Sequence, residues 1–305
     1  MVANVGKVVA VVGPTCTGKS DLALRLAPEI GGEIVNADSM QVYRGFDIGT
    51  AKPDAAARAA VAHHVIDVAK PDEAFNAADF ERAADAAIGR TWARGRVPVV
   101  VGGTGLYLRV LFHGLFEAPN EPELRERLRR RWRENPAELY SELARTDPEY
   151  AAWISPNDGI RVVRALEVRA VSGITMSEWG RRHGFRKEKY DALRIGLIRE
   201  RQELYERIDR RVEGMLERGW VGEVEDLLAR YSASAKPFQG IGYREIVLYL
   251  AGEIAYDEMV RRIKTATRRY AKRQLTWFSK EKGVEWRRWP EDRQAVFDRV
   301  RRFLD

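Results

Sequence analysis

The sequence has few residues that could crosslink the chain or hold a structural metal. Its 305 residues include one cysteine, Cys16, and 4 histidines. A single cysteine excludes an internal disulfide and a cysteine-rich zinc site, which indicates a reducing compartment. Two of the histidines, His63 and His64, are adjacent in a segment that reads as a short strand or turn. Their side chains would point in opposite directions on a strand, so we do not expect them to share a metal ion.

Long apolar runs, a charged-then-apolar leader, internal repeats and low-complexity segments are also lacking. We therefore expect a cytoplasmic protein that has no membrane partner. We also expect a monomer, although these absences do not decide the oligomeric state. Hydrophobic residues make up 45% and charged residues 32% of a chain that can bury a sizeable core. The net charge of +7 suits an acidic partner such as nucleic acid, but many ordinary enzymes share such a balance, so the distribution of charge must decide.

One glycine-rich motif is present in full, and it follows an apolar run at 7–12 that predicts a buried parallel strand. Helical spacing at 21–27 follows the motif, so the order is strand, turn and helix. Its backbone amides and the helix dipole suit a polyphosphate, Lys19 would reach the phosphate oxygens, and the Ser20 hydroxyl would ligate Mg²⁺. A tight turn without a ligand is disfavoured by the complete pattern. The motif consists of Gly13, Pro14, Thr15, Cys16, Thr17, Gly18, Lys19 and Ser20.

Polar residues follow two further predicted strands, at 33–36 and 96–101. Asp38 comes just after the first, and Thr104 follows a glycine pair after the second. The carboxyl ends of parallel strands face the ligand crevice of an open α/β sheet, so both side chains are candidates for the phosphate site. Asp38 could instead cap a helix, and Thr104 could serve as an N-cap as well as face the crevice.

These patterns predict an α/β fold with a P-loop NTPase-like parallel sheet core flanked by helices. A further strand is expected at 192–198, helices at 204–217, 221–231 and 256–280, and a last packing helix around Val296. Arg244, at the start of a helix, could reach a phosphate. We assign residues 1–115 and 191–305 to the core and 116–190 to an all-helical insertion domain.

The insertion is dense in arginine, with Trp132, Trp153 and Trp179 interleaved. Phosphates attract cations and unstacked bases pack on aromatic or guanidinium faces, so this composition fits a nucleic-acid surface. For any single arginine, a solvated helix face whose acids pair with it is the simpler interpretation.

The motifs, taken together in their order and spacing, resemble the bacterial tRNA dimethylallyltransferases, also called tRNA isopentenyltransferases, of the IPP transferase family. The resemblance covers nearly the whole chain. It rests on Gly13 to Ser20, Asp38 to Tyr43, Asp47 to Pro53, His63 to Asp67, Gly102 to Tyr107, Arg164 to Val168, Gly242 to Arg244 and Lys272 to Trp277.

The resemblance implies transfer of a dimethylallyl group from dimethylallyl diphosphate to the N6 amine of the adenosine 3′ of the anticodon, at position 37 of the tRNA. It implies that the diphosphate occupies residues 13–20 with help from Arg244, and that Mg²⁺ is held by Ser20. Asp38 would accept the amine proton, and Thr104 would help to orient the base or the diphosphate.

The resemblance also implies a tRNA-binding role for the insertion domain and for the segment that ends at Trp277. One departure is Ile160, where the family usually has Gln, so a base contact there is in doubt. The implied tRNA contacts are Asp38, Ser39, Met40, Gln41, Thr104, Arg125, Ile160, Arg161, Val162, Val163, Arg164, Lys272, Arg273 and Trp277.

Three rival functions remain open from the residues alone. A P-loop kinase or NTPase would also place a carboxylate such as Asp38 after the second strand, although no apolar strand ends in Asp-Glu. A prenyltransferase acting on free adenine nucleotides would not need the long basic insertion. A non-catalytic RNA-binding module is disfavoured by the intact phosphate motif.

Overall fold

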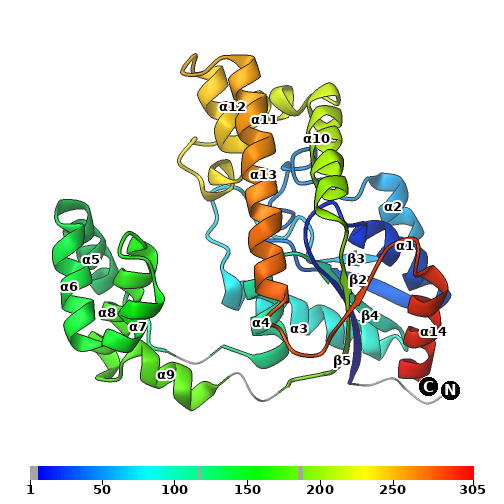
Figure 1. The fold of residues 1–305 in the computed structure, drawn as a ribbon, viewed down its shortest axis with the longest axis horizontal. Coiled ribbons are helices and arrows are strands. Elements are labelled where there is room, and N and C mark those ends of the chain that lie inside the picture. The colour runs from blue at the N-terminus through cyan, green and yellow to red at the C-terminus, as the bar shows by residue number, and fades with distance from the viewer. Residues whose placement is uncertain (1–5, 116–117, 185–187) are drawn as a thin grey trace. The chain divides into compact units, whose positions relative to one another are not determined.

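The structure is a computed structural model that describes residues 6–115, 118–184 and 188–305 (Figure 1). It divides into two compact units, of which unit 1 comprises Met1–Phe112 with Lys189–Asp305 and unit 2 comprises His113–Glu188. The insertion domain predicted from the sequence begins at residues 116 and 117, which lie outside the described residues.

Unit 1 is built on a parallel sheet of six strands in the order β3-β2-β4-β1-β5-β6. Five or more consecutive residues of β1 and β4 are buried, because helices cover both faces of the sheet. The strands are β1 (Lys7–Val12), β2 (Gly32–Asn36), β3 (His63–His64), β4 (Val97–Gly102), β5 (Asp191–Leu197) and β6 (Val284–Arg287).

The strand order brings three turns to one edge of the sheet. In the register of the parallel pairs, Val12 at the end of β1 lies opposite Gly102 in β4, and Asn36 at the end of β2 lies opposite Val101. The turns that follow β1, β2 and β4 are therefore neighbours, although they are far apart in the sequence.

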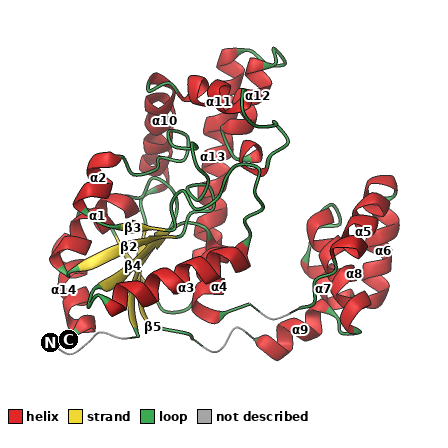
Figure 2. Cartoon of the chain, turned by 180° about the vertical axis from the view of Figure 1, so that it is seen from behind, coloured by secondary structure: helices red, strands yellow, loops and turns green. Residues whose placement is uncertain are grey.

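Alternate strand residues pack against different helices. Val9 and Val11 share a buried cluster with Leu22 of α1 (Lys19–Glu29) and Phe297 of α14 (Arg293–Leu304). Ala10 is equally buried and points to the other face of the sheet, on which α3 (Ala77–Ala93) and α4 (Gly105–His113) lie (Figure 2). The short helix α2 (Ala55–Ala60) precedes β3.

A helical group stands beyond the carboxyl edge of the sheet (Figure 1). It contains α10 (Arg201–Glu217), α11 (Trp220–Leu228), the 3₁₀ turn η1 (Lys236–Gln239), α12 (Tyr243–Leu250) and α13 (Tyr256–Phe278). The helices α10 and α13 lie side by side, with Ile208 packed in one cluster with Ala271. They cover the edge at which the three turns meet.

Most elements agree with the sequence-based prediction, including the strand at residues 7–12, the strand at 192–198 and the last helix around Val296. The sequence did not predict β6. Its residues, Val284–Arg287, are half-buried and carry two charges, because β6 is an edge strand whose side chains are partly in solvent.

Unit 2 is helical throughout its described residues and has a core of its own. Leu128, Leu139 and Val162 are among the residues buried in its cluster. Helix starts follow local chemistry, since the side chains of Asn135, Asp147, Asp158 and Thr175 each accept a hydrogen bond from a first-turn amide. The helices are α5 (Pro122–Glu134), α6 (Pro136–Thr146), α7 (Pro148–Trp153), α8 (Gly159–Ser172) and α9 (Met176–His183).

Across residues 6–115, 118–184 and 188–305, no helix combines the length and the apolar character that a membrane span requires.

Candidate active site

A cavity of about 580 Å³ lies in unit 1 where the turns after β1, β2 and β4 meet α10 and α13. The turns contribute Lys19, Asp38 and Gly103, and the helices contribute arginine, tyrosine and glutamine side chains. Other residues on its wall include Thr15, Cys16, Gly18, Ser20, Asp21, Asn36, Gln41, Thr50, Ala51, Pro53 and His63.

Residues 13–20, which we call the phosphate loop, curl tightly between β1 and α1. Gly13 has a φ of +131°, and a Cβ there would lie 2.6 Å from the carbonyl oxygen of Leu197. The hydroxyl of the buried Thr17 donates to the Pro14 carbonyl at 2.9 Å, and Gly18 forms the N-cap of α1 in a left-handed conformation. The loop therefore requires glycine at its first position and presents the start of a helix to the cavity.

Lys19 places its ammonium inside the loop, where it donates to the Pro14 carbonyl at 2.5 Å. Burial of the ammonium and, to a smaller extent, the nearby Arg211 guanidinium lower the pKa of Lys19 to about 8. Asp38 and Cys16 act in the opposite direction. A buried cation next to a second cation is a site that gains from an anion.

Asp38 lies at the cavity wall with one carboxylate oxygen committed to the fold. Its Oδ1 accepts from the Met40 amide at 2.8 Å, and its own amide donates to the Asn36 side chain at 3.1 Å. Asn36 is in turn held by a 2.9 Å bond from its Nδ2 to the Val65 carbonyl. These bonds fix the direction of the carboxylate, whose other oxygen is left for the cavity.

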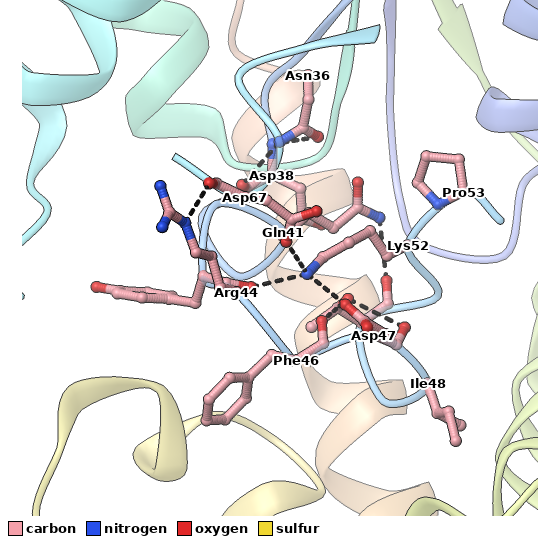
Figure 3. Close-up of polar contacts among 12 residues, drawn as sticks. Asn36, Asp38, Gln41, Arg44, Phe46, Asp47, Ile48, Lys52, Pro53 and Asp67 are labelled. Atoms are coloured by element: carbon pink, nitrogen blue, oxygen red, sulfur yellow. Dashed lines mark hydrogen bonds and ion pairs between the residues drawn. The ribbon is translucent and has the colours of Figure 1, made fainter. Parts of the chain in front are cut away.

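The loop after Asp38 has little regular structure but is held by a buried lysine (Figure 3). The Lys52 side chain is 1% exposed, and its ammonium donates to the Tyr43 carbonyl and to the carboxylates of Asp47 and Asp67 at 2.5–2.7 Å. The Gln41 amide donates to the carbonyls of residues 50 and 51. The three hydrogen bonds from the buried Lys52 ammonium hold the loop that carries Asp38 and Gln41 in place.

Thr104 connects the turn after β4 to the turn after β2. Its Oγ1 accepts from the Ser39 amide at 3.1 Å and lies 3.4 Å from the Ser39 hydroxyl. Tyr270 on α13 lines the cavity near Thr104, and burial next to Asp38 raises the pKa of Tyr270 to about 12. Thr104 is thus linked to Ser39, the residue that follows Asp38, but Thr104 itself is not among the described residues that line the cavity.

The helices supply wall residues that the sequence reasoning missed. Arg207, Arg210 and Arg211 on α10 line the cavity, and the Arg207 guanidinium donates to the Cys16 carbonyl at 3.0 Å. Tyr270 and Gln274 on α13 also line it. Their spacing, three and four residues apart, places each set on one helix face, which is the signal that could have found them.

Two family models match the chain, IPP transferase over residues 41–281 and isopentenyl transferase over residues 6–67. The chain belongs to the IPP transferase family. A similar protein from Citrifermentans bemidjiense, named tRNA dimethylallyltransferase 1, is 52% identical over 98% of this chain and 97% of its own length. The tRNA dimethylallyltransferase of Anaeromyxobacter dehalogenans is 49% identical over 96% and 99%.

Solved structures of such enzymes share the fold. A tRNA isopentenylpyrophosphate transferase from Bacillus halodurans superposes with a TM-score of 0.74 at 37% identity, covering 98% of this chain and 97% of its own. A eukaryotic dimethylallyltransferase acting on tRNA gives a TM-score of 0.83 at 32% identity, covering 97% and 77%. The P-loop-like α/β fold class predicted from the sequence is therefore confirmed.

Arg244 does not appear among the described residues that line the cavity. Its guanidinium pairs with Glu245 on the same helix turn at 2.6 Å, and its side chain is 56% exposed. The nearby Gly242 has a packing role, because a Cβ at this position would lie 1.9 Å from the Trp220 ring. The geometry gives no support to the prediction that Arg244 binds the diphosphate, whereas Arg207 and Arg211 do line the cavity.

Two arginines predicted to contact tRNA serve the interior of unit 2. The Glu167 carboxylate is fully buried and accepts from Arg125 and from Arg164 at 2.8–3.0 Å. These guanidinium groups and the Glu121 amide hold the pKa of Glu167 below its usual value against the effect of burial. Arg164 also donates to the carbonyls of residues 118 and 119. Both guanidiniums are thus largely occupied within the unit.

The segment at the start of α8 divides into buried and exposed residues. Val162 and Val163, also predicted as tRNA contacts, are 0% and 4% exposed in the core of unit 2, so their side chains cannot reach RNA. Ile160 is 86% exposed. Arg161 is exposed and pairs with Asp158, the N-cap of its own helix. Ile160 and Arg161 remain available as contacts.

The end of α13 divides in the same way. Lys272 and Arg273 are exposed, which suits a phosphate contact. Trp277 is half-buried, with the Arg109 guanidinium 4.2 Å from its ring centroid, and a Cβ at Gly105 would lie 2.4 Å from it. Its ring faces are therefore engaged in packing within unit 1.

The residues near the phosphate loop fit Mg²⁺ that arrives with a phosphate compound. In the described part of the chain, no three His, Cys, Asp or Glu side chains cluster as a metal cage. Ser20 at the start of α1 and Asp38 both line the cavity and offer oxygen atoms, which Mg²⁺ prefers in combination with water and phosphate oxygens. His64 pairs with Glu33 at 2.7 Å, and His63 bonds to the Val61 carbonyl.

Proposed function

We propose that this protein transfers the dimethylallyl group of dimethylallyl diphosphate to the N6 amine of the adenosine 3′ of the anticodon, at position 37 of a tRNA. The observation that carries the proposal is that Lys19 and Asp38 face one cavity, with arginines of α10 on its wall. Lys19 and the arginines suit a diphosphate, and Asp38 provides the proton acceptor that an amine requires.

The diphosphate leaves with growing negative charge when the allylic carbon–oxygen bond breaks. Lys19, the amides of the phosphate loop and the α10 arginines stabilise that charge. Arg211 lies close enough to Lys19 to lower its pKa, so the two cations converge on the same anion. Remote binding of the diphosphate also places the allylic carbon at a fixed distance from the acceptor.

The amine nitrogen forms a bond to the allylic carbon as the carbon–oxygen bond breaks, and it must lose one proton. Asp38 accepts this proton through the carboxylate oxygen that the Met40 amide leaves free. A positioned base typically contributes on the order of a hundredfold to ten-thousandfold. The adenosine has to leave its stack to reach Asp38, as other base-modifying enzymes require.

Mg²⁺ fits this site, with the Ser20 hydroxyl as its protein ligand beside the phosphate oxygens. When bound, the ion neutralises part of the negative charge on the diphosphate. The chain contributes the position of Ser20, which α1 fixes next to Lys19.

The tRNA would meet exposed cations on both units, of which Arg161, Lys272 and Arg273 are candidates. Arg125 and Arg164 would act indirectly, by holding unit 2 together around Glu167.

The function is tested by incubating the protein with radiolabelled dimethylallyl diphosphate, Mg²⁺ and an unmodified tRNA transcript. We expect label in the tRNA and none when the acceptor adenosine is replaced by guanosine. Label that stays out of tRNA while ATP is hydrolysed, or label that enters free adenosine monophosphate instead, would contradict the proposal.

A further inference from the structure

Gln274 lies on the buried face of α13, inside the segment whose neighbours Lys272 and Arg273 are exposed. Gln274 is 6% exposed, and both the oxygen and the nitrogen of its side-chain amide form hydrogen bonds. Oε1 accepts from the Thr15 amide at 2.9 Å, and Nε2 donates to the Gly103 carbonyl at 2.9 Å. One side chain thus joins the phosphate loop to the turn after β4.

The two turns that Gln274 joins have different tasks in the proposed reaction. Thr15 belongs to the loop that would hold the diphosphate. Gly103 precedes Thr104, whose Oγ1 accepts from the Ser39 amide next to Asp38. The path from the leaving group to the base therefore passes through Thr15, Gln274 and the Gly103–Thr104 turn.

The fit at Gly103 depends on the absence of a side chain there. A Cβ at Gly103 would lie 2.2 Å from Gln274 Nε2 and 3.2 Å from the Gly13 carbonyl oxygen. Any larger residue would displace the amide or separate the two turns. One helical turn before Gln274, Tyr270 lies on the same face of α13 and lines the same cavity, so the two side chains are neighbours there.

We propose that Gln274 is a positioning residue that sets the phosphate loop and the Thr104 turn at the spacing that the transfer needs. This inference rests on the proposed function. Gln274 acts through the Thr15 amide and the Gly103 carbonyl, and it does not itself contact the tRNA. Small errors in the distance between donor and acceptor are costly in a group transfer, so a buried link between their two supports has a direct effect on rate.

The first test replaces Gln274 by alanine and measures binding of inorganic pyrophosphate with Mg²⁺ by calorimetry. Loss of two buried hydrogen bonds that order the loop weakens pyrophosphate binding roughly tenfold. We expect KM for dimethylallyl diphosphate to rise and kcat to fall, while the affinity for tRNA and its salt dependence stay at the wild-type value. Gln294→Ala, at an exposed glutamine of α14, is the matched control and leaves all five quantities unchanged.

The second test approaches the same contact from the other turn. Gly103→Ala pushes the Gln274 amide away, so alone it reproduces the defect of Gln274→Ala. In the Gln274→Ala background the 2.2 Å clash with the amide is removed and only the 3.2 Å approach to the Gly13 carbonyl oxygen remains, so the defect of the double variant is smaller than the sum of the two single defects. Circular dichroism checks that each variant is folded, and the Gly103→Ala protein keeps the test open if Gln274→Ala is not.

Two results would overturn the inference. One is wild-type pyrophosphate affinity and kcat in Gln274→Ala with weakened tRNA binding, which would place Gln274 at the tRNA surface. The other is full additivity of the two substitutions, which would mean that they act separately. Failure of the proposed function looks different, since the wild-type protein would then bind pyrophosphate and transfer nothing to tRNA.

Discussion

Asp38 is the residue on which the chemistry depends. Its carboxylate accepts from the Met40 amide, its backbone amide donates to the Asn36 side chain, and Asp38 lines the same cavity as Lys19. Replacing it by asparagine keeps the shape and most hydrogen bonds but removes the proton acceptor. We expect Asp38→Asn to lower kcat by about a hundredfold to ten-thousandfold while pyrophosphate binding changes little.

Single-turnover transfer and calorimetry measure these two quantities separately. Asp226→Asn, at an exposed aspartate of α11, is the matched control and should leave both unchanged. Near-normal turnover in Asp38→Asn would exclude Asp38 as the base.

Lys19 predicts how donor binding depends on pH. Its pKa of about 8 in the free protein lies below the usual value of 10.5, and a bound diphosphate favours the charged form and raises it again. Below pH 8 the ammonium is already charged, so affinity is constant with respect to this group. Above pH 8 binding must take up a proton, and affinity falls by up to tenfold per pH unit.

Calorimetry with an unreactive dimethylallyl diphosphate analogue, repeated in buffers of different ionisation enthalpy between pH 7 and pH 9.5, measures the proton uptake. Affinity that stays flat across this range, with no proton uptake, would contradict the role of Lys19.

At this scale the sequence predicted part of the site. Lys19, Ser20, Asp38 and Thr104 follow strand ends, and their motifs are local, so spacing alone could find them. Arg207, Arg211 and Gln274 reach the cavity from helices that are distant in sequence, and their position depends on how α10 and α13 pack. Arg244 stays a prediction that the cavity does not support, because its guanidinium pairs with the adjacent Glu245 at the start of α12.

Among the elements, α8 shows how one motif can serve the fold and the surface together. Arg164 faces the buried Glu167, whereas Arg161 on the same helix is exposed. Arg164→Ala removes charge-assisted hydrogen bonds from a fully buried carboxylate. We expect it to lower the free energy of unfolding of unit 2 by about 1.5–3 kcal/mol.

Thermal unfolding followed by tryptophan fluorescence measures this loss, since Trp132, Trp153 and Trp179 belong to unit 2. Arg161→Ala is the matched control and should change stability by less than about 0.5 kcal/mol. Equal stability of the two variants would show that Glu167 does not need Arg164.

Arg161 carries the opposite prediction for RNA. Its exposed guanidinium pairs with Asp158 at the N-cap of its own helix, and a phosphate can compete for an exposed pair of this kind. We expect Arg161→Gln to weaken binding to every tRNA by a similar factor and to reduce the slope of log affinity against log salt by about one. Filter binding across a salt series gives the slope. A slope equal to that of the wild-type protein would remove Arg161 from the interface.

The element-scale prediction from the sequence was strongest where the pattern was periodic or apolar. Strands 7–12 and 96–101 and the long helix from residue 256 follow from burial on both sheet faces or one helix face. The edge strand β6 lacked that signal because each of its four residues is partly exposed and two of them are charged. Val162 and Val163 were predicted as tRNA contacts together with their neighbours in one sequence motif. The motif lies on a helix, so its residues point in different directions and these two apolar side chains face the core of unit 2.

For the whole molecule, the two units divide the work that the proposed function requires. Unit 1 contains the complete cavity, since every residue on its wall lies in residues 15–103 or 207–274. Unit 2 has its own core and a surface rich in arginine. A protein that modified only a free nucleotide would need the cavity alone. A test of the complete chain with tRNA therefore distinguishes a tRNA acceptor from a free-nucleotide acceptor.

The most direct test of the account is the mass of tRNA after reaction with dimethylallyl diphosphate and Mg²⁺. The tRNA is digested with a specific ribonuclease, and the fragments are compared by mass spectrometry. The account predicts that one fragment, the one containing the adenosine 3′ of the anticodon, gains the mass of a single dimethylallyl group, and that Asp38→Asn abolishes the gain. Unmodified fragments with the wild-type protein, or added mass on any other fragment, would contradict it.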